Sequence, residues 1–407
     1  MDFTIRQGLD ISVSEAPRQI IEDGSKISCV ALSGRDFHNI RFETLVELGD
    51  QVAIGEPLFR DRNRPEIIFS APASGVVSKI NHTHRRNLAS IVIICKGVSA
   101  ISFDITKEVQ TVLLESGLWT AFKTRPFGLI PDPDASAQAI LVTAMDSNPL
   151  AADPAIILQT VQESFARGLE VLAELNQTQI LVCHGAGSQF VKHQNKHIRY
   201  AAFSGKHPAG LPGTHLNRLG LSGRYVWQIG YEDVISIGHL FLTGQLSNER
   251  IISVAGPMVQ NPRLLRTQRG ANLIDLLDGE LKDGAFSIIS GSILSGRAST
   301  YLGHYDKQVT VLPKPENKSR TRFLSQPEGA IAAPILPSEV FETVMPQNIL
   351  PIPLMRALAV GDWEAAQKLG CLDLLEEDVA LLSYLCSSGT DYSALLRLAL
   401  DNLEKEM

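Results

Sequence analysis

The stretch that decides the fold of the first part of this chain covers residues 49–77 and reads GDQVAIGEPLFRDRNRPEIIFSAPASGVV. It contains two half-motifs, GDxVxxGxxL and APxxGxV, which are joined by a short connection. Gly49, Gly55 and Gly75 fall where we expect tight turns with a positive φ, which glycine adopts without strain. The pattern therefore predicts short strands in two halves that meet at a hairpin.

This two-half layout resembles the biotinyl/lipoyl carrier barrel, in which a prosthetic group hangs from a lysine at the hairpin tip between the halves. When Leu58 is aligned with the leucine of the first half-motif and Ala71 and Pro72 with the second, the tip holds Arg64. A guanidinium cannot form the amide that biotin or lipoate requires. We therefore expect residues 1–102 to form a biotinyl/lipoyl-like β-barrel without an acceptor lysine, which docks to a partner instead of carrying a group.

Composition limits the classes of protein that fit. The chain has 407 residues, enough for about three domains, and a net charge of −7, which argues against nucleic acid as a main partner. Its five cysteines are scattered without a CxxC pair, so we expect neither a zinc site nor an iron–sulfur cluster. We find no signal peptide and no apolar run of ~18 residues, so we expect membrane association only through partner proteins.

The remainder of the chain changes character three times. Two apolar runs, 138–144 and 179–183, read as buried strands, and they flank a predicted single amphipathic helix over residues 154–175. This order of elements predicts a parallel α/β domain over residues 103–250. Residues 251–315 resemble a soluble ligand-binding β-grasp module. Residues 316–335 are rich in polar residues and proline and form a predicted linker, and residues 336–407 are predicted to be helical. The expected fold class is therefore α+β, with several domains.

Two weaker patterns have plain interpretations. The segment CHGAGSQF, residues 183–190, follows a predicted strand, but Phe190 stands where a dinucleotide site needs its third glycine. A plain turn at the strand end is favoured over a nucleotide site. His193 and His197 are spaced like zinc ligands, but flanking lysines repel a cation, so we expect no metal. No arrangement of a catalytic nucleophile, base or phosphate loop is recognisable, and we expect no independent catalytic centre.

Basic residues gather on two predicted hairpins and offer a docking surface for an acidic partner. The docking candidates are Arg60, Arg62, Arg64, Arg85 and Arg86. The alternative interpretation, which carries similar weight, is a pair of solvated turns.

Two loops combine arginine, an aromatic residue and turn formers, as a quinone headgroup requires: residues 33–42 (SGRDFHNIRF) and 124–131 (TRPFGLIP). A third segment, 203–215 (FSGKHPAGLPGTH), is dense in glycine, proline and histidine, and we expect it to suit a ligand or subunit contact better than a core. The quinone-contact candidates from the three segments are Phe37, His38, Arg125, Phe127, His207 and His215. The alternatives are exposed loops with one packed phenylalanine and a structural connector between sheets.

A string of longer motifs points to one family. They include IRQGLDI, ESGLWTAFKTRPF, VTAMDSNPLAADP, FSGKHPAGLPGTH, ISVAGPMVQNPRLLRT and LGCLDLLEEDVALLSYLC. In this order the chain resembles, over residues 3–407, the A subunit of the bacterial Na⁺-translocating NADH:quinone oxidoreductase (Na⁺-NQR) family. The resemblance implies a barrel, a Rossmann-like domain, a β-grasp domain and a helical domain. The segment after residue 312 looks shorter than in that family, and LCSSGTDYS stands where a Cys-Pro-Gly turn is expected.

The resemblance also implies a role. The chain would be peripheral, on the cytoplasmic face of the inner membrane, in a respiratory complex that couples NADH oxidation and ubiquinone reduction to Na⁺ export. It would bind no cofactor itself, and its partner subunits would hold the flavins, an iron–sulfur centre, the NADH site and the sodium path. Ubiquinone remains a possible ligand. Two alternatives stay open, namely a stand-alone flavin- or NADH-binding protein and a ligand- or protein-binding module outside any complex.

Overall fold

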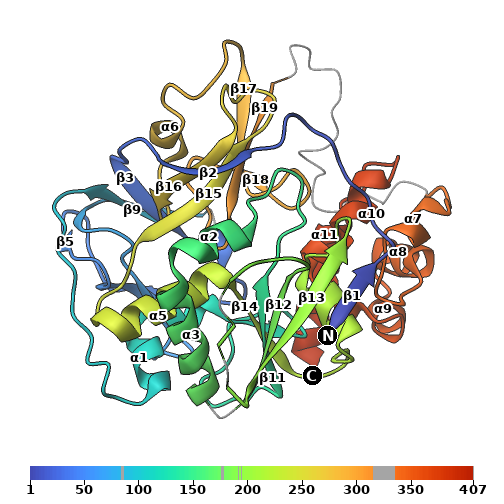
Figure 1. The fold of residues 1–407 in the computed structure, drawn as a ribbon, viewed down its shortest axis with the longest axis horizontal. Coiled ribbons are helices and arrows are strands. Elements are labelled where there is room, and N and C mark those ends of the chain that lie inside the picture. The colour runs from blue at the N-terminus through green and yellow to red at the C-terminus, as the bar shows by residue number, and fades with distance from the viewer. Residues whose placement is uncertain (84–86, 176–177, 191, 194, 315–334, 407) are drawn as a thin grey trace.

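The computed structural model describes the chain except residues 84–86, 176–177, 191, 194, 315–334 and 407 (Figure 1). Seven strands between residues 29 and 95 form two small sheets with the orders β3-β9-β8-β5 and β4-β6-β7. The strands are β3 (Cys29–Ser33), β4 (Phe42–Thr44), β5 (Gln51–Val52), β6 (Pro57–Asp61), β7 (Ile68–Ser70), β8 (Gly75–His82) and β9 (Leu88–Cys95). Both sheets contribute buried apolar side chains to one core, and we call this unit the N-terminal sandwich.

The glycines of the two half-motifs serve two different purposes. Gly49 and Gly55 have φ values of 97° and 92°, so the predicted positive φ is confirmed there. The prediction is wrong for Gly75, which lies at the start of β8 with no positive φ. A Cβ at Gly75 would lie 1.9 Å from the carbonyl oxygen of Ile94, so glycine is needed there because β9 passes so close.

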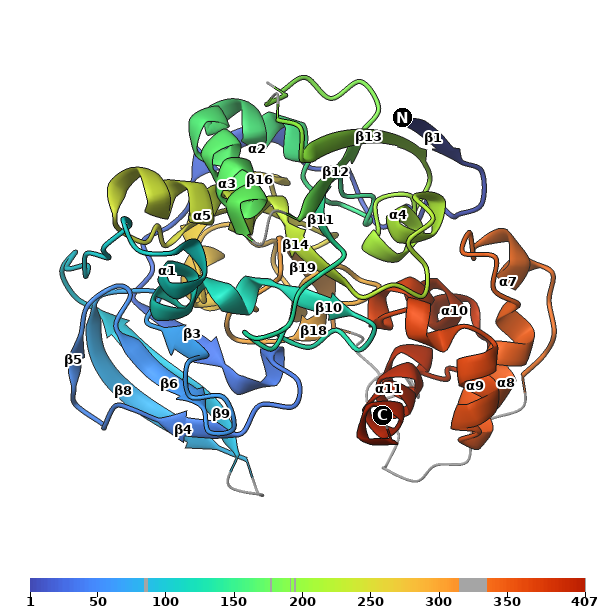
Figure 2. The same cartoon turned by 90° about the horizontal axis from the view of Figure 1, so that it is seen from below.

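A six-stranded sheet, here called the α/β sheet, has the order β1-β13-β12-β11-β14-β10 and is parallel except for β10 (Figure 2). Its strands are β1 (Asp2–Ile5), β10 (Lys123–Arg125), β11 (Ala139–Ala144), β12 (Gln179–Gly185), β13 (Ile198–Gly205) and β14 (Val226–Gly230). After β11 the chain adds β12 and β13 on one side, then returns to place β14 on the other. The strand order therefore reverses between β11 and β14.

Helices cover both faces of the α/β sheet (Figure 2). Alternate residues of β11 and β12 face the two sides: Ile140 and Val142 pack in the cluster that contains α3 and α5, whereas Leu141 packs in the cluster that contains α4. The helices are α1 (Val109–Ser116), α2 (Pro154–Thr160), α3 (Gln162–Glu174), α4 (Pro212–Arg218) and α5 (Tyr231–Thr243). The single helix expected over residues 154–175 is wrong, because Val161 leaves the helical region (φ −135°, ψ 38°) and separates α2 from α3.

The third sheet has the order β18-β17-β19-β15-β16-β2. Its strands are β2 (Arg18–Asp23), β15 (Glu249–Ala255), β16 (Arg263–Gln268), β17 (Phe286–Ser290), β18 (Arg297–Ala298) and β19 (Gln308–Pro313), with the short helix α6 (Leu273–Leu276) beside it. Two short strands of the segment 1–102, which the sequence predicts as one β domain, lie outside the N-terminal sandwich. β1 pairs with β13 of the α/β sheet and β2 pairs with β16 of the third sheet. A local sequence predicts a strand but not the distant edge that it joins.

The C-terminal part is a helical region with its own apolar core (Figure 2). It contains α7 (Val340–Thr343), α8 (Pro351–Val360), α9 (Trp363–Lys368), α10 (Ala380–Leu385) and α11 (Tyr392–Glu406), with short 3₁₀ turns at Cys371–Asp373 and Glu376–Val379. Nearly all of the predicted linker, residues 316–335, lies outside the described residues. In the part of the chain that is described, no helix is long and apolar enough to cross a membrane.

Candidate functional site

A cavity of about 420 Å³ lies where the strand order of the α/β sheet reverses. Thr143 at the end of β11 and Gly230 at the end of β14 line it. In open α/β sheets, ligands bind in the crevice outside the carboxyl ends of the strands at such a switch point. We call this the central cavity, and its volume falls within the roughly 300–1,000 Å³ that is typical of small-molecule sites.

All four parts of the chain contribute to the wall of the central cavity. The N-terminal sandwich supplies Arg35, Asp36 and His38, and the helical region supplies Glu376 and Glu377. The α/β part supplies Lys123, Asp146, Glu232 and Asp233. The third sheet and its loops supply Arg250, Arg297, His304, Tyr305 and Lys307. The cavity is thus assembled from segments that are far apart in the sequence.

Most charges at the central cavity are paired with an opposite charge. Lys307 lies 3.2 Å from Asp146, and Arg250 lies 3.3 Å from Glu232 and also contacts Asp233. Burial would raise the pKa of the Asp146 carboxyl, but the nearby Lys307 ammonium and the hydrogen bonds from Asn148 together outweigh that effect and keep this pKa below its usual range. The interior of the cavity therefore carries little uncompensated charge.

Glu232 is paired with Arg250 through only one of its two carboxylate oxygens, Oε2. Its Oε1 atom is buried and has no hydrogen-bond partner in the described part of the chain. Burial raises the pKa of Glu232 to about 7, against the opposing effect of Arg250. With Asp233 it occupies the first turn of α5, the position where doubly wound proteins commonly receive a phosphate. Two carboxyl groups at this helix start make it a poor phosphate site.

Lys123 and Tyr305 line the cavity side by side. The Lys123 ammonium lies 3.8 Å from the centre of the Tyr305 ring, within the range of a cation–π contact. Burial lowers the pKa of the adjacent His304 to about 3, so its imidazole is neutral at physiological pH. An aromatic face, a cation and a neutral imidazole thus lie next to each other.

Three of the six quinone-contact candidates gather at this cavity. His38 lines the rim, with its Nε2 3.5 Å from Glu376 Oε1. Phe37 lies behind the wall, with its ring centre 5.0 Å from that of His304. Arg125 is buried and donates to Gln228 and Asp378 at 2.8 and 2.7 Å, so it supports the wall.

The other three candidates do not line the central cavity. Phe127 accepts a hydrogen bond at its carbonyl oxygen from Arg397. His207 and His215 are only 3% and 0% exposed, and the His215 Nε2–H donates to the carbonyl oxygen of Ala209 at 2.9 Å. Segment 203–215 is thus largely buried, although its Gly210, Leu211 and Pro212 line the central cavity, so the predicted ligand or subunit contact stays a prediction. Its glycines let the backbone pack closely against neighbouring segments, Gly210 against Ser147 and Gly213 against Asp378.

The docking candidates do not form one free basic surface. Arg60 pairs with Glu43 at 2.9 Å, and Arg64 pairs with the buried Asp61 at 3.1 Å. Arg64 lies in the loop between β6 and β7, where it also donates to the carbonyl oxygen of Ile130. Arg62 is exposed, and no acid lies within ion-pair distance of it in the described part of the chain. Arg85 and Arg86 lie outside the described residues.

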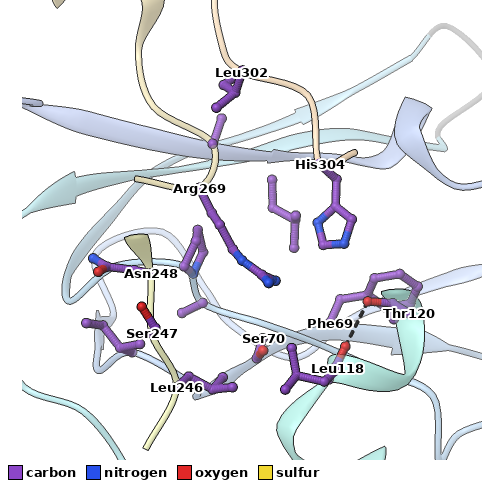
Figure 3. Close-up of a pocket in the computed structure, with 17 residues that line it drawn as sticks. Phe69, Ser70, Leu118, Thr120, Leu246, Ser247, Asn248, Arg269, Leu302 and His304 are labelled. Carbon is purple, nitrogen blue, oxygen red and sulfur yellow. Dashed lines mark hydrogen bonds between the residues drawn. The ribbon is translucent and has the colours of Figure 1, made fainter. Parts of the chain in front are cut away.

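A smaller pocket of about 40 Å³ adjoins the central cavity and shares His304 with it. Figure 3 shows the side chains of Arg269 and His304 pointing toward it, with Phe69 and Leu118 on other walls. By comparison with the ~10–15 Å³ that one water needs, it holds only a few water molecules. We therefore take the central cavity as the candidate site.

The fold and the site define a class: a multidomain α+β chain built around a ligand crevice at the switch point of a parallel sheet. Three family models match it, described as the NqrA N-terminal barrel-sandwich hybrid domain (residues 3–96), the NqrA second alpha/beta domain (105–246) and the NQRA C-terminal domain (251–300). The chain belongs to the NqrA family, the A subunits of the Na⁺-translocating NADH-quinone reductases. The resemblance drawn from the sequence motifs is thereby confirmed.

Curated relatives support the same assignment over the full length. The chain is 41% identical to the A subunit of the Na⁺-translocating NADH-quinone reductase of Cellvibrio japonicus, and the match covers 99% of both chains. It is 42% and 40% identical to the proteins of the same name from Yersinia pestis and Pseudomonas aeruginosa, with the same coverage. The first alignment has 443 positions against the 407 residues of this chain, so the relative carries residues that this chain lacks.

Solved structures of NAD⁺-reducing [NiFe]-hydrogenase are also similar in part. One matches 44% of this chain and 41% of its own chain with a TM-score of 0.33 and 13% identity, and another matches 66% and 54% with a TM-score of 0.35 and 11% identity. Likeness at this level carries no argument about fold or function.

Several residues of the central cavity were missed by the sequence analysis, above all Lys123, Glu232, His304 and Lys307. A signal was available for Glu232, because the sequence GYED follows an apolar run, and acids directly after a strand commonly face the crevice of an α/β sheet. For the other three residues the sequence contains no comparable signal, since they reach the cavity only through tertiary packing.

Proposed function

We propose that this chain is a peripheral component of a respiratory complex that oxidises NADH, reduces ubiquinone and exports Na⁺, and that it lies at the cytoplasmic face of the bacterial inner membrane. The observation that carries the proposal is the match to the A subunits of the Na⁺-translocating NADH-quinone reductases over 99% of both lengths. The chain would be one subunit of a translocase, with no catalytic centre of its own.

Within this complex the chain would dock on the membrane subunits and contact ubiquinone at the rim of the central cavity. His38 is the one quinone-contact candidate that lines the cavity directly, and Lys123 and Tyr305 supply a hydrogen-bond donor and an aromatic face beside it. Of the docking candidates, Arg62 has the free charge that an acidic partner surface would need.

We further propose a fold for each of the three parts of the chain that contain sheets. The N-terminal sandwich would be a biotinyl/lipoyl-like barrel whose tip holds Arg64 in place of an acceptor lysine. The α/β sheet would be Rossmann-like, and the third sheet would form a β-grasp domain of the soluble ligand-binding type. The order of β11, β12, β13 and β14 supports the second of these assignments.

The chain itself would bind no flavin and no iron–sulfur cluster, which would reside in partner subunits. Glu232 and Asp233 at the start of α5 support this view, because their ion pairs with Arg250 occupy the helix start where a flavin or dinucleotide phosphate would bind. The same observation disfavours a stand-alone flavin- or NADH-binding protein.

A tagged pull-down of this protein from its native membranes tests the proposal. We expect co-eluting membrane proteins, flavin absorbance in the eluate and NADH-dependent quinone reduction. A colourless protein that elutes alone would contradict the assignment and favour a binding module outside any complex. A yellow protein that elutes alone would instead favour the flavin-binding alternative.

A further inference from the structure

A second open groove, with a volume of about 590 Å³, lies between the N-terminal sandwich and the third sheet. β3 and β9 line it through Ser33 and Ser90, and β17 and β18 line it through Ile288 and Arg297. Within the described part of the chain β18 pairs only with β17, so its other edge is open. An open strand edge offers backbone N–H and C=O groups to another chain in an extended conformation.

The groove is basic, although the protein is acidic overall. Two arginines, Arg35 and Arg297, line it together with the serines and threonines, and none of the lining residues is acidic. Arg297 pairs with Asp36, but its side chain is still 44% exposed. Arg35 is exposed and has no acid within ion-pair distance in the described part of the chain. In a chain of net charge −7, this combination favours an acidic ligand.

Two large apolar side chains flank the same groove. Ile274 at the start of α6 is 55% exposed, and Phe286 at the start of β17 is 36% exposed. Single exposed apolar residues are common on protein surfaces. Here, however, an aromatic and an aliphatic residue lie beside two arginines and an open strand edge. Aromatic residues and arginine are enriched at the centres of protein interfaces.

We propose that this groove is the docking site for an extended, acidic segment of another subunit of the complex. The segment lies along the open edge of β18, with carboxylates at Arg35 and Arg297 and apolar side chains against Ile274 and Phe286. Arg35, Arg297 and Gly303 also line the central cavity, so the bound segment borders the proposed quinone-contact region. The inference rests on the proposed function, because it requires that the chain assembles with other subunits.

The first test compares full-length tagged variants expressed in the native host. Arg35→Glu and Phe286→Asp each change one groove residue, and Arg224→Glu reverses another exposed arginine that does not line the groove. We expect the two groove variants to retain at least tenfold less of the membrane subunits than the unchanged protein, and Arg224→Glu to retain them fully. Raising the salt concentration should weaken retention of the unchanged protein, because the carboxylate contacts are exposed.

A photocrosslinking residue placed at position 286 identifies the occupant. We expect the crosslinked peptide to be rich in aspartate and glutamate and to come from one of the co-purifying subunits. A crosslink to a second copy of this chain, or to a neutral or basic peptide, would overturn the proposal.

The outcomes also separate this inference from the proposed function. If the unchanged protein retains no membrane subunits, the proposed function fails. If the unchanged protein retains them and Arg35→Glu and Phe286→Asp do so equally well, only the groove proposal fails. Circular dichroism melting of each purified variant establishes that reduced retention does not come from unfolding.

Discussion

His215 allows a quantitative prediction about acid stability. Its side chain is fully buried, its Nε2–H donates to the carbonyl oxygen of Ala209, and its Nδ1 has no partner in the described part of the chain. Burial lowers the pKa of His215 to about 3. In the unfolded chain the pKa of a histidine is about 6.5, so the unfolded state binds more protons than the folded state between these values. Folding is therefore disfavoured as the pH falls through 6.5.

The magnitude follows from linkage. Between pH 7 and pH 5 the unfolded histidine becomes almost fully protonated, whereas the buried one stays neutral. At about 1.4 kcal/mol per pH unit below 6.5, this difference removes about 2 kcal/mol from the free energy of unfolding at pH 5. Burial likewise lowers the pKa of His207 to about 4, which adds a similar loss. Such losses are a large fraction of the roughly 5–15 kcal/mol that stabilises a typical domain.

The assay is denaturant unfolding of the unchanged protein and of His215→Gln at pH 7 and at pH 5. Glutamine can still donate to Ala209 but does not take up a proton. We expect the loss of stability between the two pH values to be smaller by about 2 kcal/mol in this variant. His197→Gln, at a partly exposed histidine, is the matched control and should leave the loss unchanged. If the loss is as large in His215→Gln as in the control, the reasoning is refuted.

Three further predictions concern other contacts. Arg125→Met leaves the buried carboxylate of Asp378 without its cation, so this variant should lower the free energy of unfolding by about 3–5 kcal/mol. Adding Asp378→Asn should restore part of the lost stability, and denaturant unfolding measures both effects. Gly168→Ala and Gly238→Ala each place a Cβ within 2.1 Å of a carbonyl oxygen where α3 meets α5, and should each lower stability by about 1–3 kcal/mol and reduce the melting temperature. Arg62→Glu should reduce co-purification of the membrane subunits at low salt without lowering the melting temperature, and equal co-purification would exclude this arginine as a docking contact.

The local parts of the fold could be predicted from the sequence. The apolar runs at 138–144 and 179–183 correspond to β11 and β12, because buried parallel strands read as continuous apolar segments. The sheet edges could not be predicted. β1 and β2 are short strands near the N-terminus that pair with β13 and β16, far along the chain, and nothing in their own residues specifies those partners.

The candidate site was less predictable than the fold. Loops that combine an arginine, an aromatic residue and a histidine can lie in the core or at the surface, and the sequence does not separate the two cases. His38 lines the central cavity, whereas His215, which belongs to an equally distinctive motif, is buried against Phe203 with a ring-centre distance of 4.2 Å. The loop before His215 packs tightly because it contains glycines: a Cβ at Gly210 would lie 2.6 Å from the Ser147 nitrogen, and one at Gly213 would lie 2.3 Å from Asp378 Oδ1.

At two places in this chain, charged side chains are held by internal contacts where the proposed folds would place a bound group. In the loop between β6 and β7, where the proposed carrier-like fold would place an acceptor lysine, Arg64 is tied to Asp61 and Ile130 instead of projecting freely. At the switch point of the α/β sheet, Glu232 and Asp233 occupy the helix start where a phosphate would otherwise bind, and Arg250 holds them there. In both cases internal ion pairs occupy the position that a bound group would take in the proposed folds. Under the proposed function we expect partner subunits to carry the electrons, and we expect this chain to meet them near Arg35 and Lys123, which line the central cavity.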